Sequence, residues 1–97
     1  MRARDLKQCD LGLMPGDAEW LRKLYAMPEN RPMLYASARE ACPELAELLV
    51  ISLVWGVSYD RMCVLIRIPL NINDFYLYRR KALALFKRKI MENNKTP

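Results

Sequence analysis

LVWGVSYDRMCVLIRIPLNIND, residues 53–74, is the stretch that decides the fold. Gly56 follows an apolar run, and glycine is the residue that most often ends a helix in the left-handed conformation. Ser58 comes two positions later and is a good N-cap for a second helix. Pro69 disfavours the helical conformation in the residue before it, so a turn is expected there. The stretch therefore predicts the end of one helix, a short second helix and the start of a third.

The three helices around these turns are predicted over 43–55, 58–67 and 74–91. Apolar residues almost encircle the first, which is therefore expected at the centre of the core. The apolar side of the short helix is assigned to Met62, Val64, Leu65 and Ile66. Asn73 or Asn71 caps the last helix, whose apolar side is assigned to Phe75, Tyr78, Ala82, Leu83, Leu85, Phe86 and Ile90. Three helices in this order, joined by tight turns, predict a C-terminal tri-helical helix-turn-helix.

Two further helices are predicted before these three. One covers 17–27, with Asp17 as its N-cap and Pro28 after its end, and the other covers 33–41. No segment alternates with a period of two, so the predicted fold class is all-α with about five helices. The 97 residues fit one domain. We expect a flexible arm over 1–15, one helical domain over 16–91 and a flexible tail over 92–97.

The composition excludes several classes of protein. The chain has no His, which removes His-based acid–base chemistry, Cys-His nucleophile pairs and His metal sites. Its three Cys residues are scattered and form no Cys-x-x-Cys motif, so no zinc site and no disulfide framework are expected. Free thiols are typical of a reducing cytoplasm. We predict no catalytic residues, no cofactor and no membrane span, and a cytoplasmic location.

The positive charge lies at one end of the sequence. Residues 1–73 hold nine Lys and Arg residues and nine Asp and Glu residues, whereas residues 74–97 hold seven and two. The whole net charge of +5 therefore belongs to the last helix and its tail. Such a helix is the electrostatic footprint of a polyanion-binding protein. The alternative explanation of this charge is that the cations complement the negative C-terminal end of the helix dipole. This explanation fits residues 87–89, but it fits 79–81 poorly because they lie near the middle of the helix.

The start of the last helix carries residue types that read DNA bases. Asn pairs with the adenine edge and Arg with the guanine edge, while other cations hold phosphates. An N-cap such as Ser58 can also face a phosphate. The candidate contacts are Ser58, Asn71, Asn73, Tyr76, Arg79, Arg80, Lys81, Lys87 and Arg88. The two Asn residues are equally well explained as caps and Tyr76 as a core margin, and only one of the adjacent Arg79 and Arg80 is expected to read a base.

Residues 53–69 resemble the helix-turn-helix of sigma-factor region 4. In that family a Gly-x-Ser pair precedes a short helix with a small residue, and an apolar-Gly-apolar-Ser/Pro turn leads into the recognition helix. The matching positions are Gly56, Ser58, Cys63, Ile66, Ile68 and Pro69. The chain departs from the family pattern at three positions. Arg61 replaces the usual acidic residue, Arg67 replaces the turn glycine, and Asn71 replaces the Thr or Ser that usually begins the recognition helix.

A second resemblance is to the PapB-type regulators of pilus operons. Their Leu-x-Pro-Gly start resembles Leu13-Met-Pro-Gly16, and their Leu-Val-x-Gly-x-Ser…Cys pattern resembles Leu53, Val54, Gly56, Ser58 and Cys63. The spacing between the two blocks is longer in this chain. Both resemblances imply control of bacterial or phage transcription, and neither implies an enzyme.

We therefore expect a sequence-specific binder of double-stranded DNA that regulates transcription through a recognition helix at about 73–91. RNA polymerase is a further expected partner, and apolar residues in the N-terminal helices favour a homodimer on two half-sites. The alternative is a helical protein–protein interaction module whose basic last helix docks on an acidic partner, such as RNA polymerase or a component of a secretion system.

Overall fold

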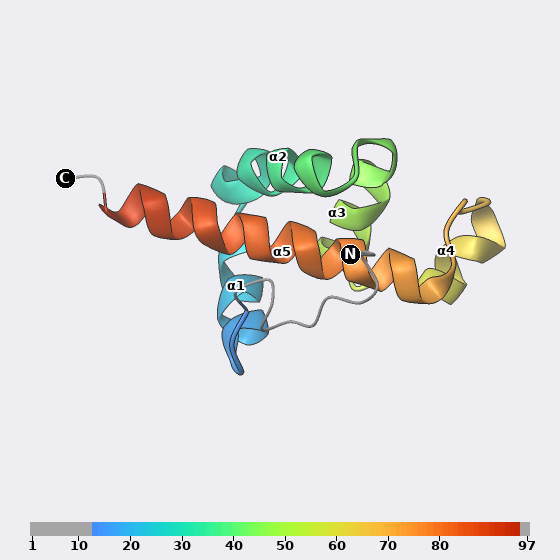
Figure 1. Ribbon diagram of the computed structural model, residues 1–97, viewed down its shortest axis with the longest axis horizontal. Coiled ribbons are helices and arrows are strands. Elements are labelled where there is room, and N and C mark those ends of the chain that lie inside the picture. Colours follow the sequence, from blue (N-terminus) through green and yellow to red (C-terminus); the bar gives the residue numbers. More distant parts are fainter. Residues whose placement is uncertain (1–12, 96–97) are drawn as a thin grey trace.

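The computed structural model describes residues 13–95, and the described part is all-α (Figure 1). Its five α-helices are α1 (Asp17–Tyr25), α2 (Arg31–Ala41), α3 (Ala46–Trp55), α4 (Tyr59–Leu65) and α5 (Ile72–Lys95). Short 3-10 turns, η3 (Pro28–Asn30) and η4 (Pro43–Leu45), precede α2 and α3. Residues 13–95 contain no strand. The predicted fold class, all-α with about five helices, is confirmed.

The longest helix, α5, forms the centre of the molecule. Its 24 residues extend about 36 Å, most of the 45 Å long axis of the fold. It contacts each of the other four helices, and α2 lies alongside it (Figure 1). The sequence analysis expected residues 43–55 at the centre: α3 does bury Leu49, Val50 and Leu53 in the core, but Trp55 is exposed and the helix that contacts all four others is α5. With ten residues, α3 spans about 15 Å and is too short to line the whole core.

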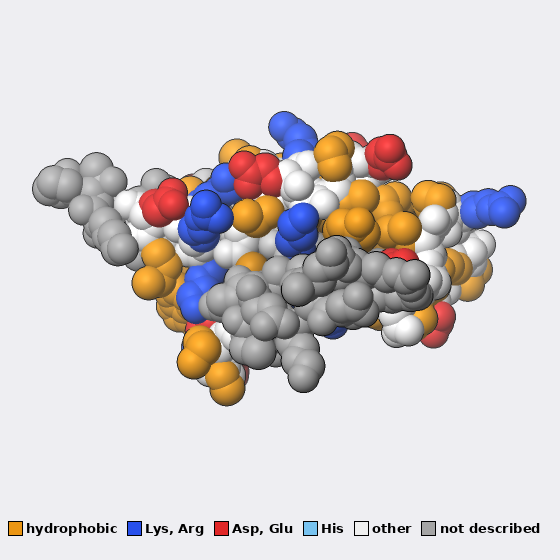
Figure 2. Space-filling view, viewed as in Figure 1, with side chains coloured by type: hydrophobic (Ala, Val, Ile, Leu, Met, Phe, Trp, Pro, Cys, Tyr) orange, Lys and Arg blue, Asp and Glu red, His pale blue; other side chains and the backbone are white. Residues whose placement is uncertain are grey.

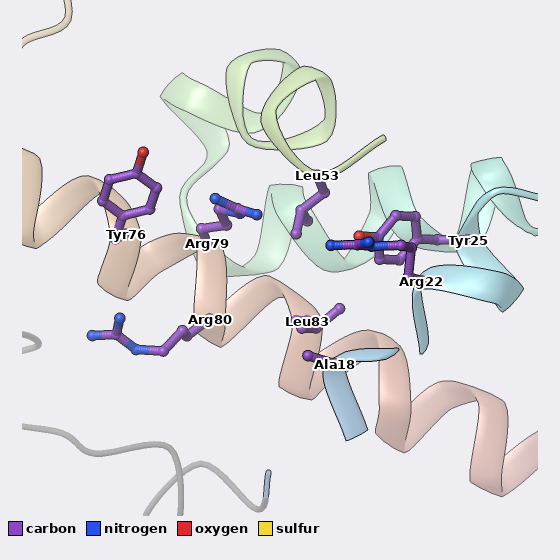
Figure 3. Close-up of a pocket in the computed structure, with 8 residues that line it drawn as sticks. All are labelled: Ala18, Arg22, Tyr25, Leu53, Tyr76, Arg79, Arg80 and Leu83. Atoms are coloured by element: carbon purple, nitrogen blue, oxygen red, sulfur yellow. The ribbon is translucent and has the colours of Figure 1, made fainter. Parts of the chain in front are cut away.

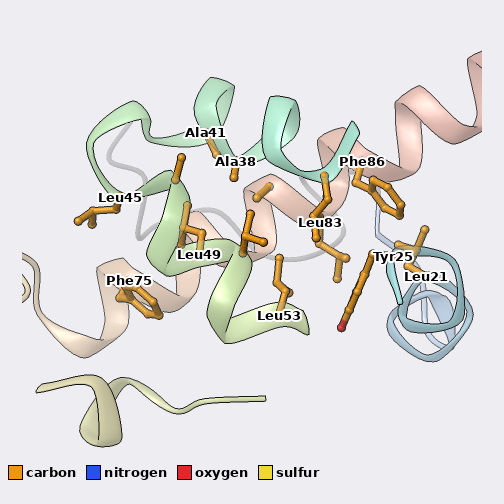
Figure 4. Packing of buried hydrophobic residues seen from close by; sticks show 14 of the residues in the cluster. Leu21, Tyr25, Ala38, Ala41, Leu45, Leu49, Leu53, Phe75, Leu83 and Phe86 are labelled. Carbon is orange, nitrogen blue, oxygen red and sulfur yellow. The ribbon is translucent and has the colours of Figure 1, made fainter. Parts of the chain in front are cut away.

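Figure 4 shows core side chains of α1, α2, α3 and α5, and Met62 of α4 also belongs to the core. Phe75 and Phe86 of α5 are fully buried, together with Leu21 of α1, Leu34 of α2 and Leu49 of α3. The edge of the Tyr25 ring packs on Phe86, with ring centroids 6.2 Å apart. All the residues assigned to the apolar side of the last helix are buried or half-buried. Because α5 is covered on several sides, it also buries Leu77, which the sequence analysis did not assign to the core.

The N-terminal boundaries differ from the prediction by a few residues. Gly16, with a φ of 91°, is the N-cap of α1, so the predicted cap Asp17 is the first helical residue instead. The carboxylate of Asp17 accepts a hydrogen bond from the backbone N–H of Met14 (2.7 Å). Helix α2 begins at Arg31 rather than at residue 33, because Pro32 fits the first turn of a helix, where its missing N–H is not needed.

The turns quoted at the start of the sequence analysis are confirmed. Gly56 ends α3 with a φ of 67°, and Ser58 caps α4. The last helix begins two residues earlier than predicted, at Ile72, and runs one turn further, to Lys95, through part of the expected tail. Of the expected N-terminal arm, 1–12 lies outside the described residues, and Leu13 is buried in the core.

The predicted apolar side of the short helix was wrong for three of its four residues. Met62 is buried, but Val64 and Leu65 are 82% and 85% exposed, and Ile66 is 45% exposed. The reason is that α4 lies at one end of the molecule and packs on the start of α5 (Figure 1). A helix of seven residues supported from one side can bury only one narrow face.

Candidate nucleic-acid interface

Asn71 and Asn73, at the start of α5, have different roles. The backbone N–H of Asp74 donates to Asn71 Oδ1 (2.8 Å), and Asn71 Nδ2 donates to Asp74 Oδ2 (3.2 Å). Asn71 is therefore the cap of α5, the structural role that the sequence left open. Asn73 is exposed in the first turn of the helix. Of the two, Asn73 is the one whose side chain is not used to start α5.

Tyr76 joins α5 to α4. Its hydroxyl oxygen accepts a hydrogen bond from the backbone N–H of Tyr59, the first residue of α4 (3.0 Å). The Tyr59 hydroxyl donates to the carbonyl of Leu70, and its ring packs against Phe75 at 5.5 Å. Burial, and then a hydrogen bond with Cys63, raise the pKa of Tyr59. These contacts fix the short helix on the long one, and they occupy the hydroxyl of Tyr76.

A second cap begins α4. The backbone N–H of Arg61 donates to Ser58 Oγ (3.3 Å), and Ser58 itself is exposed. Ser52, buried in α3, donates its hydroxyl to the carbonyl of Val57 (2.8 Å) and so closes the Gly56 turn. The Ser58 hydroxyl therefore caps α4, and the Ser58 side chain lies at the surface.

The cations in the first half of α5 have no acidic partner among residues 13–95. Arg79, Arg80 and Lys81 are half-buried, and no described carboxylate lies within 4 Å of them. The guanidinium of Arg79 lies over the Tyr76 ring, 5.4 Å from its centroid. In Figure 3 Arg80 points away from Arg79 along the helix. As the sequence predicts for adjacent helical residues, the two guanidinium groups serve different surfaces.

The cations in the second half of α5 are paired. Lys87 lies 2.7 Å from Asp17, Lys89 lies 3.3 Å from Glu40, and Arg88 lies 3.6 Å from Glu92. Figure 2 shows acidic and basic side chains next to one another over this part of the molecule. The pKa of Asp17 is lowered, chiefly by the hydrogen bond from Lys87. Lys87, predicted to hold a phosphate, thus fastens α1 to α5.

The sequence analysis left three arginines out of its candidate contacts: Arg22, Arg61 and Arg67. Arg22 of α1 is far from the last helix in sequence, yet it lines the same pocket as Arg79. Nothing in the local pattern around Arg22 could have revealed this, because only the packing of α1 on α5 brings them together. Arg61 and Arg67 are also exposed, and these could have been noticed, since both are basic departures inside the helix-turn-helix stretch.

Within residues 13–95, no three acidic or Cys side chains are grouped in a way that could hold a metal ion. None of the described helices is both long and apolar enough to span a bilayer.

Comparison with known protein families, with curated proteins and with solved structures finds no match to this chain.

Proposed function

We propose that this protein binds specific DNA sequences and regulates transcription, with the first half of α5 as the reading element. The observation that carries the proposal is the run Arg79–Lys81, whose positive charge has no carboxylate partner within the described part of the chain. A phosphate backbone supplies the negative charge that such a run lacks. The paired cations at 87–89 show that the fold neutralises its lysines and arginines elsewhere on the same helix.

Asn73 and Arg80 are the best base-reading pair. They are seven residues apart, so on an α-helix they project within about 20° of the same direction. Asn can pair with adenine and Arg with guanine in the major groove. Lys81, which has no described carboxylate partner, is suited to a phosphate contact, and the exposed Arg88 would have to exchange its pairing with Glu92 for one. Asn71, Tyr76 and Lys87 already serve the fold, so their proposed contribution is to position the helix.

The deciding experiment selects bound sequences from a random duplex pool and then measures affinity by fluorescence anisotropy. Arg80→Ala should cost roughly 1–3 kcal/mol on the selected site and relax the preference at one base pair. Arg39→Ala, an equal loss of charge on α2, is the matched control and should change affinity little. If four to six phosphates are contacted, log K should fall with log[salt] with a slope of about −4 to −5.

Two results would contradict DNA binding: no duplex bound at low salt, or a flat salt response. Losses that are equal for selected and random duplexes would contradict sequence-specific reading. The same titrations, run with sedimentation, test the proposed homodimer, because a symmetric dimer should occupy two half-sites about one helical turn apart.

The second candidate is a protein–protein interaction module, with RNA polymerase or a secretion component as partner and with the same cytoplasmic location. The exposed apolar side chains of α4 favour it, because Val64, Leu65 and the nearby Trp55, which is 70% exposed, are not needed to bind a phosphate backbone. Random duplex DNA separates the candidates, since an interaction module should not shift it in a gel.

A further inference from the structure

A cavity of about 220 Å³ lies where α1, α3 and α5 meet. Leu53 of α3 and Leu83 of α5 line its apolar part, and Tyr25 of α1 also lines it. Arg22 of α1 and Arg79 of α5 extend toward each other across Leu53 (Figure 3). The cavity therefore combines an apolar surface with two guanidinium groups that come from helices distant in sequence.

The charge of the cavity is not balanced within the described residues. No carboxylate of residues 13–95 lies within 4 Å of Arg22 or Arg79. The residues that line the cavity include a third arginine, Arg80, and no acid. Three arginines around one hollow whose lining holds no acid give it a positive potential, which an anion would neutralise. The arrangement thus favours an anionic ligand.

The dimensions and donors narrow the ligand class. At about 220 Å³ the cavity is smaller than the pockets of roughly 300–1,000 Å³ that hold drug-sized ligands, so it suits a small molecule. Guanidinium forks bind phosphate oxygens in pairs, and a tyrosine hydroxyl can donate to another oxygen. The two leucines suit a short carbon skeleton. We propose that this cavity binds a phosphate monoester of a small organic molecule, held by Arg22 and Arg79.

This ligand site shares Arg79 with the basic run proposed to contact DNA, and Arg80 also lines it, but its second arginine, Arg22, lies outside that run. Arg80 points away from the Arg22–Arg79 pair, and Arg22 is on α1, outside the helix-turn-helix (Figure 3). Where the protein also binds DNA, as proposed above, an occupied cavity lies beside the reading residues on α5 and is placed to act as an effector site. Binding of the monoester itself does not require DNA.

The test is isothermal titration of the full chain, without DNA, with ribose 5-phosphate as the probe. We expect saturable binding of one equivalent, no binding of ribose and weaker binding of succinate. Arg22→Gln should weaken ribose 5-phosphate roughly tenfold or more, as expected for the loss of a charge-assisted hydrogen bond. Lys23→Gln, the same charge change on an exposed neighbour that does not line the cavity, should stay within about twofold.

Three outcomes would overturn the proposal: no saturable binding to the wild-type protein, equal losses in the two variants, or tighter binding of succinate than of ribose 5-phosphate. Circular dichroism confirms that the variants are folded. Arg79→Lys provides a second variant, because it keeps the charge and loses the planar fork, and it should also weaken the monoester. All of these measurements are independent of DNA, so their failure would leave the proposed DNA binding to its own test.

Discussion

Replacing Tyr76 by Phe tests how α4 is held on α5. The change removes only the hydroxyl, whose oxygen accepts the backbone N–H of Tyr59 at 3.0 Å. The ring keeps its contacts with Phe75, at 5.7 Å between centroids, and with the Arg79 guanidinium. The loss is therefore one hydrogen bond and the stranding of a half-buried donor, about 1–1.5 kcal/mol. For a domain of this size we expect Tm to fall by about 4–12 °C.

Tyr78→Phe is the matched control. Tyr78 is half-buried on the same helix, and its hydroxyl makes no hydrogen bond within residues 13–95. Urea unfolding of both variants is followed by far-ultraviolet circular dichroism, with amide hydrogen exchange in α4 as a local probe. Tyr76→Phe should lower the midpoint by roughly 0.5–1 M and speed exchange in α4. Equal midpoints for the two variants would refute the reasoning, because the Tyr76 hydroxyl would then contribute nothing.

Three further predictions concern stability. Asn71→Ala should destabilise the fold by about 1 kcal/mol through the lost cap, whereas Asn73→Ala should stay within about 0.5 kcal/mol; urea unfolding checks both, and the reverse order would contradict the capping role. The hydrogen bond from Lys87 lowers the pKa of Asp17 below 3.8, its usual value. The ionised carboxylate therefore stabilises the fold above pH 3.8, and this stabilisation is lost as the pH falls through the lowered pKa of the folded state. Asp17→Asn should therefore flatten the acid limb of the stability–pH curve below about pH 4, and an unchanged limb would count against the ion pair. Phe86→Ala should cost about 3–5 kcal/mol, a large share of the roughly 5–15 kcal/mol by which a domain is stable, and a thermal transition little changed from that of the wild type would contradict its place in the core.

Local sequence signals predicted the helices and the turns between them. Gly56, Ser58 and Pro69 act on their immediate neighbours, so their positions alone mark where helices end and begin. The global arrangement was harder to predict. Which helix becomes central depends on the summed burial along its whole length, and the ring of apolar residues around 43–55 does not reveal that sum. Val64 and Leu65 of α4, and Ile66 just after it, are exposed because no other helix of the described residues packs over that end of the fold.

The candidate site was predictable only in part. The basic character of α5 follows from the sequence, but which cations remain without partners depends on contacts between helices. Lys87 and Lys89 pair with Asp17 and Glu40, residues that no local pattern connects to them. Arg22 joins Arg79 for the same reason. Tertiary packing sets pairings of this kind. The local apolar periodicity of a single sequence predicts helices, but it does not predict which side chains of different helices meet.

That α5 is both the proposed reading element and the core of the fold restricts how the protein can evolve. A one-residue insertion in the middle of this helix would rotate every later side chain by about 100° and turn Phe86 and Ile90 out of the interior. New target preferences must therefore arise by substitution at the few positions that the core does not use, such as 73, 80 and 81. Lineages that keep this architecture should vary in those side chains while the length of the helix stays constant.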